Sequence, residues 1–127
     1  QRPAALVREA LDADAPGTPL IAFPRGAGAA LAPYAATVRP AGLAVDSATD
    51  MAWAASVVDT PCALQGNLDP IFLRGPLDAL DKELDRLRGA MEGRPHILNL
   101  GHGILPGTPE ENGAYFFEIG KQVNELL

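Results

Sequence analysis

The stretch HILNLGHGILPGTPEE, residues 96–111, contains in order the signals of a strand, a glycine-rich turn and a helix start. Residues 96–100 are mostly apolar, as is typical of a buried strand. The Gly-His-Gly sequence at 101–103 then breaks the run. Residues 108–111, Thr-Pro-Glu-Glu, form a capping box with proline at the first helical position. This stretch therefore predicts one β-α unit.

The same alternation extends upstream. Three further apolar runs predict strands, at residues 19–23, 43–45 and 61–64. Helical patterns predict helices at residues 3–13, 29–38, 47–58 and 76–91, and from 109 to the chain end, where Phe116, Ile119, Val123 and Leu126 form one stripe. Strands that alternate with helices indicate parallel β-α units in an α/β protein. Four strands fit either a small doubly wound sheet or half of an eight-stranded barrel.

Composition narrows the class of protein. The 127 residues are 47% hydrophobic, which predicts a single globular segment. A net charge of −6 without a Lys/Arg block repels phosphate, so we expect no nucleic-acid partner. No apolar run approaches the roughly 20 residues of a membrane span, so we expect no membrane partner. The lone Cys62 agrees with a reducing cytoplasm, and the absence of an initiator Met suggests a processed or cut product.

Polar residues follow each predicted strand. Arg25 comes after the first strand and Asp46 after the second. The remaining candidates follow the third and fourth strands: Gln65, Asn67, Asn99 and His102. Ligands of parallel α/β folds bind at the carboxyl ends of the strands, so we expect these side chains to share one rim.

Each candidate also has a structural interpretation. Arg25 is equally typical of a solvated loop cation, Asp46 of a helix cap, and Asn67 of a turn former. His102 is the best candidate for catalysis, because the glycines on both sides allow a ligand to approach and an imidazole can hydrogen-bond or protonate an anionic group. One cysteine with no His-x-Cys spacing predicts no metal site.

Several segments together resemble a known family. Residues 64–70, LQGNLDP, and 97–112, ILNLGHGILPGTPEEN, closely resemble two signature blocks of the uroporphyrinogen decarboxylases. Residues 23–28, FPRGAG, and 43–46, LAVD, resemble two further family segments. The resemblance implies a (β/α)8 barrel, of which residues 1–127 would be a single segment, the C-terminal half with four parallel β-α units.

The resemblance also implies an activity. Members of this family remove the carboxyl groups of the four acetate side chains of uroporphyrinogen III, giving coproporphyrinogen III for haem synthesis, without metal or organic cofactor. His102 matches the family's histidine that contacts the tetrapyrrole substrate. The family's key aspartate lies upstream of this chain, so we expect the segment to be inactive without the missing N-terminal half of the barrel. At full length, a cytoplasmic homodimer is expected.

Two alternatives stay open. The first is a corrinoid-linked methyltransferase of the same barrel superfamily, which would need a zinc-thiolate site, and the lone Cys62 argues against it. The second is a non-catalytic half barrel that serves as a binding module.

Ser47 departs from the family pattern, since many relatives place Trp there.

Overall fold

The computed structural model describes residues 2–125 of the chain, and the side chains of residues 2–122. Its elements are α1 (Arg2–Asp14), β1 (Ile21–Ala22), η1 (Gly28–Ala30), α2 (Leu31–Val38), β2 (Gly42–Ala44), α3 (Met51–Val57), β3 (Ala63–Gln65), η2 (Pro70–Arg74), α4 (Leu77–Ala90), β4 (His96–Ile97) and α5 (Glu110–Glu125). This order confirms the predicted alternation of strands and helices. Of the predicted stripe on the last helix, Leu126 and the side chain of Val123 lie outside the described residues.

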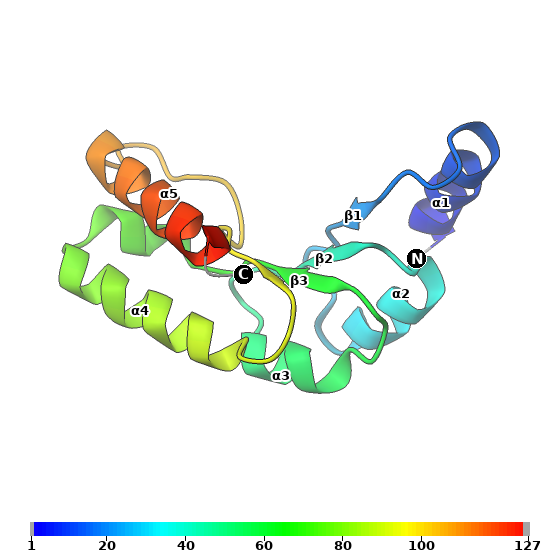
Figure 1. Ribbon diagram of the computed structural model, residues 1–127, viewed down its shortest axis with the longest axis horizontal. Helices are drawn as coiled ribbons and strands as arrows, with labels where there is room; N and C mark the ends of the chain where they lie inside the picture. Colours follow the sequence, from blue (N-terminus) through cyan, green and yellow to red (C-terminus); the bar gives the residue numbers. More distant parts are fainter. Residues whose placement is uncertain (1, 126–127) are drawn as a thin grey trace.

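The strands form one parallel sheet in the order β1-β2-β3-β4. Ala22 lies beside Leu43 in the ladder, and Leu43 lies beside Leu64. Crossovers between parallel strands are almost always right-handed, so a strand order that advances in one direction places all connecting helices on one face. Figure 1 shows α2, α3 and α4 on the same side of the strands.

The core lies between the sheet and these three helices. Leu43 of β2 and Leu64 of β3 are fully buried, as are Met51 of α3 and Leu80 of α4. Successive residues of a strand point to opposite faces. Gln65 and its neighbours in register therefore face away from the helices, on the second face of the sheet.

The second face of the sheet carries exposed apolar side chains. Ile21 is 51% exposed, Phe23 47% and Ile97 38%. The apolar side predicted for the first helix is also uncovered, since Leu6 and Val7 of α1 are at least half exposed. In the described part of the chain, the apolar surface is therefore packed on one face of the sheet only.

Local boundaries differ from the sequence-based expectation. β1, β3 and β4 are shorter than the predicted apolar runs, because the ladder hydrogen bonds cover only part of each run, whereas β2 has the predicted length and begins one residue earlier. The helix predicted from residue 47 begins at Met51, with Asp50 as its N-cap: the Asp50 carboxylate accepts from the Trp53 amide at 2.7 Å. The predicted caps Ser47 and Thr49 are wrong, and the Thr49 hydroxyl donates to Asp46 instead.

The short 3-10 helix η2 was not predicted from the sequence. The η2 turn is capped by Asp69, whose side chain accepts from the Ile71 amide, and Pro70 occupies its first position.

Among residues 2–125, no helix combines the length and the apolar character that crossing a membrane requires.

Candidate functional site

A hollow of about 460 Å³ opens beside the carboxyl ends of the strands. Its wall comes from all four strand segments: Ile21, Phe23, Ala44, Gln65 and residues 99–103. Because the strands are parallel, their carboxyl ends meet at one edge of the sheet. The hollow therefore lies where parallel α/β folds bind their ligands.

Three of the predicted site residues line this hollow: Gln65, Asn99 and His102. His102 is partly exposed, between two glycines. Its ring makes no hydrogen bond within the part of the chain that the structure describes, so the hydrogen-bonding capacity of the ring nitrogens is not used by these residues. The Asn99 Oδ1 accepts from the Leu100 amide at 2.8 Å, which leaves its amide nitrogen to donate.

Asp46 lies apart from the wall of the hollow, in a buried turn. It is 7% exposed, and its Oδ2 accepts from the Gly26 amide at 2.6 Å. Its Oδ1 accepts from the Ala48 amide at 3.1 Å and from the Thr49 hydroxyl at 3.0 Å. Burial raises the pKa of the Asp46 carboxyl, but these hydrogen bonds and the charge of His102 outweigh burial and lower the pKa.

Asn67 and Arg25 also lie outside the wall. Asn67 is 6% exposed, and its Nδ2 donates to the backbone oxygens of Asp46 at 2.8 Å and Thr49 at 2.5 Å. Arg25 is exposed in the loop after β1, directly before Gly26. The structure thus separates the six candidates into three wall residues, two buried residues that hold a turn, and one exposed cation.

The hydrogen bonds of the Asp46 carboxylate with Thr49 and Gly26 were not predicted from the sequence. The Asp46–Thr49 bond has a local signal, because Asp and Thr side chains at this spacing commonly close turns. The bond from Gly26 to Asp46 joins residues in different β-α units, and no spacing rule indicates it. Only the packing of neighbouring strand ends brings these groups together.

His96 has a structural role. Its Nε2 donates to the backbone oxygen of Gly66 at 2.5 Å. Burial lowers the pKa of the His96 imidazole, and this hydrogen bond opposes the shift without cancelling it. His96 thus ties β4 to the end of β3.

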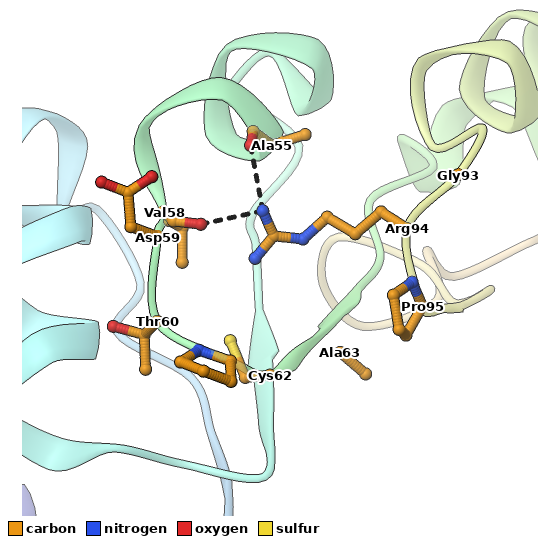
Figure 2. Close-up of a pocket in the computed structure, with 10 residues that line it drawn as sticks. Ala55, Val58, Asp59, Thr60, Cys62, Ala63, Gly93, Arg94 and Pro95 are labelled. Carbon is orange, nitrogen blue, oxygen red and sulfur yellow. Dashed lines mark hydrogen bonds between the residues drawn. The ribbon is translucent and has the colours of Figure 1, made fainter.

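A larger hollow, of about 690 Å³, lies at the amino ends of β3 and β4 (Figure 2). Arg94 reaches across it, and its Nη1 donates to the backbone oxygens of Ala55 at 2.9 Å and Val58 at 2.8 Å. These bonds satisfy carbonyl groups at the carboxyl end of α3. Burial raises the pKa of the nearby Cys62 thiol, against the opposing effect of Arg94. The guanidinium therefore serves the fold, and the thiol is a weak nucleophile.

The described residues bring together no group of three or more His, Cys, Asp or Glu side chains that could hold a metal ion. Cys62 precedes β3, whereas His102 follows β4. In a parallel sheet these positions lie at opposite ends of the strands.

Comparisons with known proteins agree on one family. Residues 2–123 match the profile described as uroporphyrinogen decarboxylase (URO-D). The chain is similar to the uroporphyrinogen decarboxylase of Granulibacter bethesdensis, with 46% identity over 92% of this chain and 34% of the relative. The proteins of the same name from Gluconacetobacter diazotrophicus and Maricaulis maris are 44% and 45% identical, each over 85% of this chain and 30% and 31% of the relative. The chain thus spans about a third of the length of the curated relatives it matches.

Proposed function

Because this chain belongs to the uroporphyrinogen decarboxylase family, we propose that it forms part of an enzyme that decarboxylates the four acetate side chains of uroporphyrinogen III to give coproporphyrinogen III in haem biosynthesis. The observation that carries this proposal is the position of His102 in the hollow at the carboxyl ends of four parallel strands. An imidazole can donate a hydrogen bond or a proton to a substrate carboxylate or its reaction centre.

The proposed chemistry uses the substrate as its own electron sink. Protonation of a pyrrole α-carbon allows the acetate C–C bond to break and carbon dioxide to leave. A proton then adds to the side-chain carbon, and the α-carbon loses its added proton, which restores the pyrrole. These reaction steps need no metal or organic cofactor. We assign His102 to the catalytic role, with Gln65 and Asn99 as hydrogen-bonding contacts for the substrate in the same wall.

The other three candidates receive different roles. Arg25, exposed beside the rim, can attract the carboxylates of the substrate. The polar atoms of Asp46 and Asn67 are engaged within the protein, so we assign these residues to holding the rim rather than to direct binding.

We also propose that residues 1–127 form one segment of a (β/α)8 barrel, its C-terminal half. The sequential strand order, with α2, α3 and α4 on one side of the strands, supports this, because a doubly wound sheet reverses its order and carries its connecting helices on both faces. The exposed apolar face, with Ile21, Phe23 and Ile97, would then be covered by the rest of the barrel. The complete protein would be a homodimer in the cytoplasm, where Cys62 stays reduced.

Neither alternative gains support. A corrinoid-linked methyltransferase would need Cys62 and His102 in one zinc site, and they lie at opposite ends of the sheet. A binding module without catalysis does not require a histidine between two glycines in the wall of the hollow.

The experiment compares the isolated chain with a chimera, in which this chain replaces the matching third of the Granulibacter bethesdensis relative. Both are assayed with uroporphyrinogen III under anaerobic conditions. We expect turnover by the chimera and almost none by the isolated chain. An inactive but folded chimera, or robust turnover by the isolated chain, would contradict the proposal.

A further inference from the structure

The turn at residues 46–49, here called the Asp46 turn, is held from several directions. Internally, the Asp46 carboxylate accepts from Ala48 and Thr49. Externally, it accepts from Gly26 in the loop after β1, and the Asn67 side chain after β3 donates to two carbonyls of the turn. None of these residues lines the hollow. The turn is therefore fixed to two neighbouring segments without itself facing a ligand.

The same turn packs against the glycine that precedes His102. A Cβ built on Gly101 would lie 2.8 Å from Ser47 Cα, and closer still to the Ser47 amide nitrogen and hydroxyl, whereas ordinary van der Waals contact begins at 3.4 Å. Gly101 cannot retreat freely, because its amide donates to the Leu68 oxygen at 2.8 Å. This contact joins the ends of β2 and β4, which are not neighbours in the sheet.

We propose that the Asp46 turn is a positioning unit for His102, which acts by fixing Gly101 through the backbone of Ser47. The inference rests on the proposed function, because it takes His102 as the catalytic residue. A misplacement of about 1 Å in a catalytic group can cost roughly 100-fold in rate. A turn that sets the position of Gly101 therefore controls the rate without touching the substrate.

The chimera carrying Gly101→Ala tests the contact directly. The added Cβ must push Ser47 and Gly101 apart, so we expect kcat to fall roughly 10-fold to 100-fold. KM should stay unchanged, since an interaction that serves only the transition state affects kcat and kcat/KM equally. The control is Gly113→Ala in α5, where an added Cβ meets no atom within 4 Å, and it should leave both constants unchanged.

Thr49 and Asp46 test the turn without any added bulk. Thr49→Val removes the hydroxyl donor to Asp46 and should lower kcat at constant KM, whereas Thr49→Ser keeps the donor and should restore it. Asp46→Asn keeps an Oδ1 for Ala48 and Thr49, so it should retain more activity than Asp46→Ala. Equal losses within each pair, or a raised KM as the main effect, would overturn the positioning role.

A measurement that does not depend on turnover separates this inference from the proposed function. The NMR signals of the His102 imidazole should shift in the Gly101→Ala chimera and stay in place in the Gly113→Ala chimera. Unmoved His102 signals in Gly101→Ala would overturn the inference, even with an active parent. An inactive parent with shifted signals would instead contradict the proposed function and leave the positioning contact supported.

Discussion

The two ends of the sheet both carry a hollow and a basic side chain, but they use these features differently. At the amino ends, the hollow is the larger, yet the Arg94 guanidinium is engaged with two carbonyls of the chain. At the carboxyl ends, the smaller hollow presents Gln65, Asn99 and His102 along its wall. Hydrogen-bonding capacity left for a ligand, rather than volume, therefore distinguishes a candidate site from a structural joint.

The largest expected difference between the two ends is catalytic. In the chimera, His102→Asn removes the imidazole proposed as general acid and should lower kcat by about 100-fold to 10,000-fold. Cys62→Ala at the opposite end should leave kcat and KM unchanged, because burial keeps that thiol protonated. Steady-state kinetics with uroporphyrinogen III measure both variants. If Cys62→Ala were as damaging as His102→Asn, the comparison of the two ends would fail.

The next largest effect concerns stability at the amino ends. Arg94→Ala leaves the Ala55 and Val58 carbonyls without their donor and should lower the free energy of unfolding by about 2 to 3 kcal/mol. Urea titration of the chimera measures this loss, with the exposed Lys82→Ala as the matched control. The KM of the folded Arg94→Ala protein should not change. A raised KM without lost stability would instead place Arg94 in a binding site.

A smaller change of opposite sign is expected at the carboxyl ends. The Ser47 hydroxyl is buried and has no hydrogen-bond partner in the described part of the chain. Ser47→Ala should therefore raise the free energy of unfolding, by about 1 kcal/mol. Ser56→Ala serves as the comparison, because the Ser56 hydroxyl donates to the Trp53 oxygen and its loss should not stabilise the protein. A lower Tm for Ser47→Ala than for the parent would contradict this prediction and would point to a hydrogen-bond partner for the Ser47 hydroxyl.

The smallest expected effect is on pH dependence. Burial lowers the folded-state pKa of His96, so the unfolded chain binds a proton more readily. The contribution of His96 to stability is thus complete above the ordinary value of 6.5 and is lost as the pH falls toward the folded-state pKa. His96→Gln can still donate to Gly66 but cannot titrate, so unfolding curves of the chimera should depend less on pH in this range. If the free energy of unfolding changed with pH equally in the parent and in His96→Gln, the proposed contribution of His96 would be contradicted.

The order of elements was predictable because apolar periodicity is a local property. The runs at 43–45 and 61–64 each correspond to a strand, and the glycine-flanked His102 lies at the carboxyl ends of the strands, in the wall of the hollow. The burial of the Asp46 and Asn67 side chains was not predictable, because it depends on hydrogen-bond partners about 20 residues away in the sequence. The cap at Asp50 was missed because Ser47 and Thr49 offered equally good capping side chains.

The most direct test of the site is a crystal structure of the chimera with coproporphyrinogen III bound under anaerobic conditions. The tetrapyrrole should lie in the hollow at the carboxyl ends of the strands, with a His102 ring nitrogen within hydrogen-bond distance of it. A tetrapyrrole seated instead around Arg94, or a His102 ring directed away from the bound product, would contradict the account.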